Sequence, residues 1–325
     1  MEQRNYRMDN IRFLLILCVL VGHFIELFKG SFSSDLYKII YSFHMPAFLF
    51  LTGYFAHFQP KKIILNLIYP YILFQILYQL FDSFIIKKQQ EVSLQFSTPY
   101  WLLWYLLVTI YYYLLLPFFD AVKPSSCVFM ICASVLLSLL AGYDTSIGYY
   151  GSLARFFSFL PFFLAGHYYS RIKRKQEDYS LWLMLLLAAF LFLASYYIIE
   201  NPNITRKVVY GSCSYEKANY HVALKLFLLL VGFAWISFLL FIVPNKKVPL
   251  LSALGQHTLP VFLLHGFLVK LAGKYKIFCY SESENLILTL ILSVAIICIF
   301  GNSWSAKWFQ KIFTGKWIDD INKII

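Results

Sequence analysis

Ten segments of the chain are apolar enough to cross a lipid bilayer, which takes roughly 20 largely apolar residues in a helix. They cover residues 11–28, 41–58, 63–83, 100–119, 126–142, 152–170, 180–199, 223–243, 250–272 and 285–303. Each is continuously apolar, whereas the strands of a membrane β-barrel alternate at every second residue. The pattern predicts an all-α, polytopic transmembrane helix bundle, formed by one domain over residues 1–325.

The composition excludes a water-soluble globule and a disordered chain. Apolar residues make up 60% of the sequence and charged residues 14%, against about 25% charged residues in soluble domains. The mean hydropathy is +0.66. The net charge of +12 falls mainly in the loops of one side, so nucleic acid is not needed to explain it. We expect a multi-pass protein of the cytoplasmic membrane, surrounded by lipid.

Ten crossings place both termini on the same side of the membrane. If that side is the cytoplasm, its loops hold sixteen of the 28 Lys and Arg residues, and the outer loops hold ten. The positive-inside rule therefore predicts an N-in and C-in orientation. Two outer loops, 200–222 and 273–284, carry Cys213 and Cys279. A disulfide between them stays open as an alternative, because sequence alone cannot establish proximity.

The first segment contains ionisable residues, which are expensive inside a bilayer and usually functional. Arg12 and His23 are eleven residues apart. On an α-helix they lie within about 20° of one face and about 16 Å apart along the axis. Asp9 and Glu26 flank them at a spacing of three residues. The pattern predicts a polar stripe along an internal cavity, although singly Arg12 also suits a positive-inside anchor and His23 an interhelical hydrogen bond.

The second segment has polar and small residues. His44 is predicted near the outer rim, and Pro46 in the first turn of the helix, where proline costs little. Thr52 and Gly53 are small enough for close packing between helices or for exposure of backbone to a ligand. The sequence leaves both alternatives open.

Two further segments combine proline with ionisable residues. The sixth contains Arg155, which could also snorkel to the outer interface, and then Pro161 and Gly166, which predict a kinked or broken helix beside a cavity. The ninth contains Pro260, which can free a backbone carbonyl, and His265. For His265, a hydrogen bond in the core is the alternative to a functional role.

Trp101 and Trp104 open the fourth segment at the predicted outer interface. Aromatic residues gather at that depth in membrane proteins, and stacking on a sugar ring is the alternative that gives them a function. The sequence has no glycine-rich nucleotide loop and no His-Glu-x-x-His, Cys-x-x-Cys or Gly-x-Ser-x-Gly motif. We therefore expect no metal site and no serine-hydrolase mechanism.

Taken in order, these motifs resemble those of the acyltransferase-3 family of integral membrane acyltransferases. An Arg, ten residues and a His in the first helix mark that family, and Arg12 and His23 match them behind Asp9. Its other motifs resemble four stretches of this chain: Phe43–Tyr54 with Thr52 where serine is commoner, Trp104–Leu106, Arg155–Gly166 and Gly255–His265.

The resemblance implies transfer of an acyl group from acyl-CoA to a hydroxyl of a cell-surface or exported polysaccharide, such as a capsule or an exopolysaccharide. Acetyl from acetyl-CoA is the first choice of donor, and succinyl is the alternative. His23 would act as general base or would accept the acyl group itself, with Arg12 and Glu26 as catalytic partners. Arg12, Arg7, Thr52 and Gly53 would bind the acyl-CoA. Residues expected to contact the carbohydrate acceptor are His44, Trp101, Trp104, Arg155 and His265. The polysaccharide-synthesis machinery is the expected protein partner.

A transporter or flippase for a glycan or small solute is the rival hypothesis, because ten helices with a buried polar stripe suit it equally well. The sequence shows no inverted repeat of the kind that many transporters have, and the family resemblance favours the enzyme. A purely structural scaffold would leave the Arg and His of the first segment unexplained.

Overall fold

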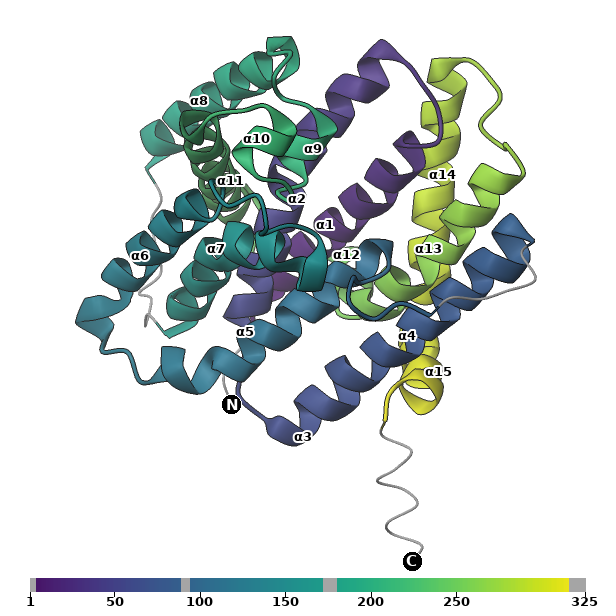
Figure 1. The fold of residues 1–325 in the computed structure, drawn as a ribbon, viewed down its shortest axis with the longest axis horizontal. Coiled ribbons are helices and arrows are strands. Elements are labelled where there is room, and N and C mark those ends of the chain that lie inside the picture. Colours follow the sequence, from purple (N-terminus) through teal and green to yellow (C-terminus); the bar gives the residue numbers. More distant parts are fainter. Residues whose placement is uncertain (1–3, 89–93, 172–179, 316–325) are drawn as a thin grey trace, which may run out of the picture. The chain divides into compact units, whose positions relative to one another are not determined.

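A computed structural model describes residues 4–88, 94–171 and 180–315, and every regular element in those ranges is a helix (Figure 1). The described residues contain no strand, and each of the ten apolar segments coincides with helix. Contacts divide the chain into two compact units. Unit 1 comprises residues 1–33, 58–110 and 246–325, and unit 2 comprises residues 34–57 and 111–245.

Unit 1 is built on α1 (Tyr6–Ile25), against which α12 (Pro249–Gly255), α13 (Thr258–Lys274) and α14 (Glu282–Phe300) pack (Figure 1). A continuous helical stretch over 60–87, the beginning of α5 and a last helix, α15, complete it. Their bounds are α3 (Pro60–Ile63), a π-helix (Ile64–Ile68), α4 (Tyr69–Leu80), a second π-helix (Phe81–Lys87), a 3-10 turn (Trp101–Leu103), α5 (Trp104–Asp120) and α15 (Ser303–Phe313).

Hydrogen bonds at one end of α1 and a ring contact at the other fix the helix within unit 1. At its amino end, Asn10 Nδ2 donates to the carbonyl of Lys246 (3.1 Å). The hydroxyl of Ser252 on α12 donates to Asn10 Oδ1 (2.7 Å). Beyond its carboxyl end, the backbone N–H of Ser33, in the first turn of α2 (Ser31–Tyr54), donates to Glu282 at the start of α14 (2.6 Å). The ring of Phe24, near the carboxyl end of α1, lies 5.6 Å from that of Phe278 in the loop before α14. The loop before α12 therefore lies beside the start of α1, and the loop before α14 lies beside its end.

Unit 2 contains most of α2 (Ser31–Tyr54) and the second part of α5. Within it α6 packs on α7, and α8 packs on α11. The bounds are α6 (Cys127–Leu140), α7 (Leu153–Arg171), α8 (Leu181–Glu200), α9 (Arg206–Val209), α10 (Tyr215–Ala218) and α11 (Val222–Ile242), with 3-10 turns at Pro124–Ser126 and Tyr150–Ser152.

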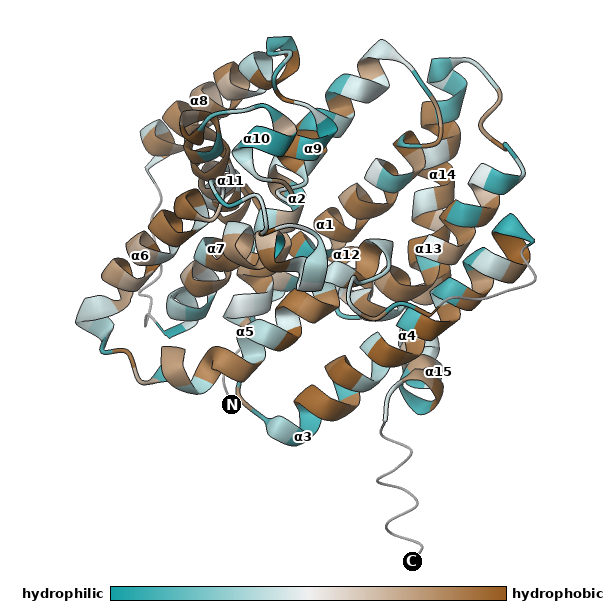
Figure 2. Cartoon of the chain, viewed as in Figure 1, coloured by the Kyte–Doolittle hydropathy of each residue, from teal (hydrophilic) through white to brown (hydrophobic). Residues whose placement is uncertain are grey.

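Six helices in the described ranges are long and apolar enough to span a membrane: Tyr6–Ile25, Pro60–Lys87, Trp101–Asp120, Leu181–Glu200, Val222–Ile242 and Glu282–Phe300. Figure 2 shows α8 as hydrophobic along most of its length. On α8, Trp182, Leu186 and Phe192 are 77%, 68% and 74% exposed. Apolar surface exposed to that extent has to be covered, and a lipid bilayer is the surrounding that suits helices of this length and composition. The chain is therefore a membrane protein. The other predicted segments lie in shorter or more polar helices, α2, α6, α7 and the α12–α13 pair.

The predicted start of the second helix is wrong. The helix begins at Ser31, so Pro46 lies inside α2 and not in its first turn. The added turns are held by packing within unit 2: Tyr37 is 1% exposed, and its ring stacks on that of Tyr41 at 3.9 Å. Residues 31–40 were not apolar enough to be recognised as helix, because this contact supplies stability that no hydropathy pattern records.

Three further predictions concern α7, the ninth segment and two cysteines. Of the two predicted alternatives for α7, a kink or a break, the structure excludes the break, since the helix runs without interruption through Pro161 and Gly166. The ninth segment is interrupted before Pro260, which lies in the first turn of α13. The cause of that interruption is tertiary: α12 ends at Gly255, which packs directly on the backbone of α1. The alternative left open for the cysteines is decided against a disulfide, since Cys213 and Cys279 are free thiols.

Gly166→Ala is expected to destabilise unit 2, because a Cβ at this position would overlap the carbonyl oxygen of Phe50 on α2. Overpacking of this kind costs about 1–3 kcal/mol. The thermal unfolding midpoint in detergent should therefore fall by several degrees. Gly148→Ala is the control, since a Cβ there would meet nothing within 4 Å. Equal midpoints for the two variants would contradict the close crossing of α2 and α7.

Candidate active site

Two aromatic rings from other parts of unit 1 contact the ring of His23, near the carboxyl end of α1. His23 is 9% exposed. The centroid of its ring lies 4.7 Å from that of Trp101, edge to face, and 5.4 Å from that of His265, stacked. Trp104, at the start of α5, is also buried, and its ring lies 6.3 Å from that of Tyr105. His23 is thus enclosed between an indole and a second imidazole.

The hydrogen bonding of His265 identifies the protonated nitrogen of its ring. His265 is fully buried, and its Nδ1 lies 3.0 Å from the carbonyl oxygen of Val261. Because a carbonyl only accepts, Nδ1 carries the proton and donates it. The other nitrogen, Nε2, makes no hydrogen bond with any residue that the structure describes. In the neutral ring it holds a lone pair and can accept a proton or a hydrogen bond beside His23.

Arg12, His23 and Glu26 keep the relation that their spacing predicts, because α1 is one uninterrupted helix. Arg12 therefore lies three turns, or about 16 Å, before His23. Glu26 Oε2 lies 3.9 Å from His23 Nδ1, which is close enough for an electrostatic contact and too far for a hydrogen bond. The start of the helix is positively charged: Arg7 and Arg12 are both half-buried there.

A charged cluster beside these rings was missed by the sequence analysis. The ammonium of Lys270 lies 5.6 Å from the centroid of the Trp101 ring and 3.5 Å from Asp82 Oδ1. The ammonium of Lys87 lies 2.8 Å from Asp82 Oδ2. A signal was present in the sequence, since Asp82 stands inside a predicted apolar segment, where an ionisable residue calls for an explanation.

The backbone of Trp101 is held in an unusual conformation. Its φ of 34° lies in the region that residues with a side chain rarely occupy and that costs about 1–3 kcal/mol. The preceding loop is clamped by the buried side chain of Gln75, which donates to the carbonyls of Gln95 (2.7 Å) and Thr98 (3.0 Å). Gln75 also accepts from the backbone N–H of Tyr100 (2.8 Å). The fold thus fixes the indole beside His23.

Two of the expected donor-binding residues lie in unit 2 and are occupied by packing. The hydroxyl of Thr52 donates to the carbonyl of Phe48 in its own helix (2.9 Å). Gly53 lies so close to α7 that a Cβ would overlap the carbonyl oxygen of Phe163. The structure therefore favours close helix packing as the reason for a small residue at Gly53.

The other predicted residues of unit 2, Arg155 and His44, lie among tyrosines. The guanidinium of Arg155, which is 7% exposed, lies 5.3 Å from the Tyr149 ring and 5.9 Å from the Tyr210 ring. Tyr41 contacts Tyr210 edge to face at 5.2 Å and His44 at 4.7 Å. Arg155 is thus buried in a cage of aromatic rings, an arrangement that favours a cation.

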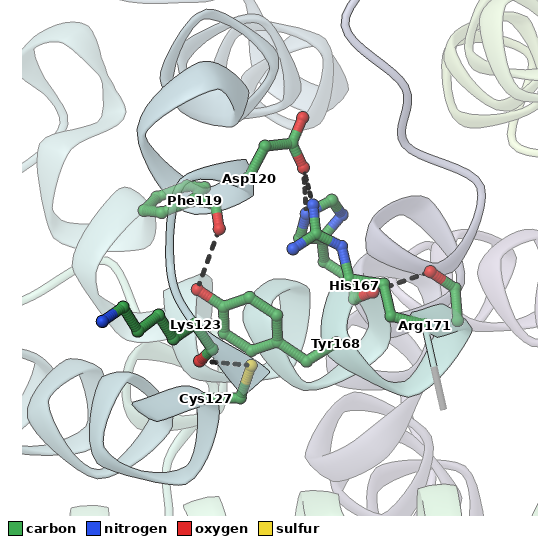
Figure 3. A network of polar contacts seen from close by, with 8 residues as sticks. Phe119, Asp120, Lys123, Cys127, His167, Tyr168 and Arg171 are labelled. Atoms are coloured by element: carbon green, nitrogen blue, oxygen red, sulfur yellow. Dashed lines mark hydrogen bonds and ion pairs between the residues drawn. The ribbon is translucent and has the colours of Figure 1, made fainter. Parts of the chain in front are cut away.

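Another polar cluster that the sequence did not predict joins the ends of α5 and α7 in unit 2 (Figure 3). Asp120 Oδ1 accepts a hydrogen bond from Nε2 of the buried His167 (2.9 Å). Asp120 also pairs with Arg171, one turn further along α7. Nearby, the hydroxyl of Tyr168 donates to the carbonyl of Phe119 (3.5 Å). These contacts tie two helices of unit 2 together at one end.

Asp120→Ala is expected to destabilise the protein by about 1 kcal/mol, a modest value because the carboxylate is partly exposed to solvent. The loss arises because His167 and Arg171 both lose their shared acceptor. Chemical unfolding in mild detergent measures it. Lys123→Ala, which removes an exposed charge from the next loop, is the control. An Asp120→Ala variant as stable as that control would show that the cluster contributes nothing to stability.

Comparison with known proteins gives one result that bears on these residues. No curated protein and no solved structure matches the chain. Residues 5–302, which run from the start of α1 to the end of α14, match the family whose description is acyltransferase domain, Acyl_transf_3. The match covers most of the 325 residues and includes His23 together with the residues around it. The chain therefore belongs to the acyltransferase-3 family of membrane acyltransferases.

Proposed function

We propose that this acyltransferase moves an acyl group, acetyl in the first place, from cytosolic acyl-CoA to a hydroxyl of a cell-surface or exported polysaccharide. It would lie in the cytoplasmic membrane with ten crossings and both termini in the cytosol. Contacts within unit 1 support this topology. The start of α1 meets the loop at Lys246, and Phe28, in the loop after α1, stacks on Phe278 in the loop before α14 at 5.4 Å. Loops assigned to the same side of the membrane thus lie together.

The observation that carries the proposal is the enclosed imidazole of His23, on the same helix as Arg12 and flanked by Trp101 and His265. In the first form of the mechanism, His23 takes the proton of the acceptor hydroxyl. The hydroxyl oxygen attacks the thioester carbonyl carbon, the carbon–sulfur bond breaks, and the proton passes on to the leaving thiolate. Glu26 would stabilise the protonated imidazole through the 3.9 Å contact.

In the second form, a nitrogen of His23 attacks the thioester carbonyl carbon, the carbon–sulfur bond breaks, and CoA leaves as its thiolate while the ring carries the acyl group as an acyl-imidazolium. The acceptor hydroxyl then displaces the imidazole and gives up its proton. His265 Nε2, with its lone pair beside His23, would receive that proton. This form lets the two substrates react in turn from opposite sides of the membrane.

Charge and ring chemistry assign the remaining roles. Arg12 and Arg7 would hold the phosphates of the donor, since a guanidinium binds phosphate in a bidentate geometry. Thr52 and Gly53 would contribute by holding α2 against α7. The acceptor hydroxyl would lie beside Trp101, Trp104 and His265 in unit 1. The other two predicted acceptor residues, His44 and Arg155, belong to unit 2.

Labelled acyl-CoA tests the proposal. Purified protein is incubated with labelled acetyl-CoA or succinyl-CoA and a purified polysaccharide. We expect label on the polysaccharide as an alkali-labile ester, with one acyl group preferred. Movement of the polysaccharide across a membrane without label would instead support the transporter hypothesis.

A further inference from the structure

Unit 2 has an open depression of about 440 Å³ between the carboxyl end of α8 and the amino end of α11. It lies on the loop of residues 201–221, which the predicted topology places outside the cell. Three asparagines line it, Asn201, Asn203 and Asn219. None of the functional residues discussed above lines it. A volume of this size is in the range of pockets that bind small organic molecules.

The lining combines amide groups with aromatic rings and carries no fixed charge. None of the described residues that line it is Lys, Arg, Asp or Glu. Amides both donate and accept hydrogen bonds, which matches the hydroxyl groups of a neutral sugar. The side chains of Asn203, Asn219 and His221 are exposed and make no hydrogen bond to other described residues, so these groups are available to a ligand.

Two aromatic residues form an apolar wall of the depression. The rings of Tyr197 and Phe227 contact each other edge to face at 5.1 Å. Tyr197 is 48% exposed. A sugar ring has one face of C–H groups, which packs on an aromatic ring, while its hydroxyl groups point outward toward polar partners. A wall of rings opposite amide groups suits both parts of such a ligand.

The depression is formed before any ligand binds, because local hydrogen bonds fix its loop. Asn201 Oδ1 accepts from the backbone N–H of Asn203 (2.9 Å). Asn219 has a left-handed φ of 51°. The loop is tied down at two further points: Lys217 Nζ donates to the carbonyl of Thr145 (2.6 Å), and Tyr215 OH donates to that of Leu139 (2.8 Å). Preorganisation lowers the cost of binding.

We propose that this depression binds neutral sugar units of a glycan and so holds the acceptor polysaccharide on the enzyme. The proposal rests on the proposed function in that the glycan held there is the acceptor of the acyl group. Its chemical prediction is specific: neutral hexoses and N-acetylhexosamines should bind, and uronic acids should not be preferred.

The test is binding of the purified full-length protein to an array of neutral and acidic oligosaccharides. The variant is Asn203→Ala combined with Asn219→Gly. Glycine at 219 keeps the positive φ while removing the amide, so the loop should retain its shape. Glu216→Ala, an exposed change on the neighbouring α10 outside the lining, is the control. We expect neutral oligosaccharides to bind the wild type and the control, and the double variant at least tenfold more weakly.

Two results would overturn the proposal: binding of no neutral oligosaccharide by the wild type, or equal binding by the double variant. Acyl transfer measured in the same preparations separates this proposal from the function proposed above. If the double variant loses glycan binding and the wild type shows no acyl transfer, the proposed function is refuted and the binding site stands. Acyl transfer by the wild type, together with equal glycan binding by the wild type and the double variant, would support the proposed function and refute the binding site.

Discussion

His23→Ala lowers the rate of acyl transfer by roughly 10²- to 10⁴-fold if His23 takes a proton or the acyl group in the reaction. The expectation follows from the position of the ring. It is enclosed between Trp101 and His265 and lies on the same helix as Arg12. The loss should appear in kcat, while the KM for acyl-CoA stays close to that of the wild type, because alanine removes the reacting group and leaves the start of α1 unchanged.

A matched control separates this effect from a general loss of histidine. His57, in the loop after α2, is exposed, and His57→Ala should transfer acyl groups at the wild-type rate. His23→Gln keeps a polar side chain in the enclosed space and should be as inactive as His23→Ala. Equal inactivity of the two variants would exclude loss of packing as the cause. A wild-type rate in a normally inserted His23→Ala protein would refute the catalytic assignment.

Arg12→Ala raises the KM for acyl-CoA by roughly 10- to 100-fold, because a hydrogen bond to a charged group contributes about 1.5–3 kcal/mol and each 1.4 kcal/mol is a factor of ten. The rate at saturating donor should change much less. This split in the kinetic constants is the opposite of the one expected for His23→Ala. Steady-state rates over a range of acyl-CoA concentrations measure both constants.

Two companion variants sharpen the result for Arg12. Arg12→Lys keeps the charge and loses the planar fork that binds phosphate in two places, so its KM should be intermediate. Lys247→Ala removes an exposed cation from the loop before α12 and should leave the KM unchanged. If Arg12→Ala and Lys247→Ala gave the same KM, Arg12 would have no part in binding the donor.

The helices of this chain could be predicted from the sequence because hydropathy alone defines most of them. Each of the ten apolar segments coincides with helix, and the relation of Arg12 to His23 follows from helical periodicity. The first turns of α2 could not be predicted, since they depend on the packing of Tyr37 and Tyr41. The same holds for the end of α12, which depends on contact between Gly255 and α1.

The candidate site could be predicted only along a single helix. The meeting of His23 with His265 depends on how α13 packs on α1, and the residues are too far apart in sequence for any local pattern to report it. Trp101 was recognised as a residue at the outer interface, but its positive φ and the clamp by Gln75 are tertiary features. Asp82 was the avoidable omission, because a carboxylate within an apolar segment is a signal in itself.

We propose that His23, as general base or as carrier of the acyl group, acts between a donor on one side of the membrane and an acceptor on the other. Sealed proteoliposomes with polysaccharide inside and labelled acetyl-CoA outside test it most directly. We predict ester-linked label on the enclosed polysaccharide with the wild-type protein, and background label with His23→Ala inserted in equal amount and orientation. Equal labelling of the enclosed polysaccharide by both proteins would contradict the account.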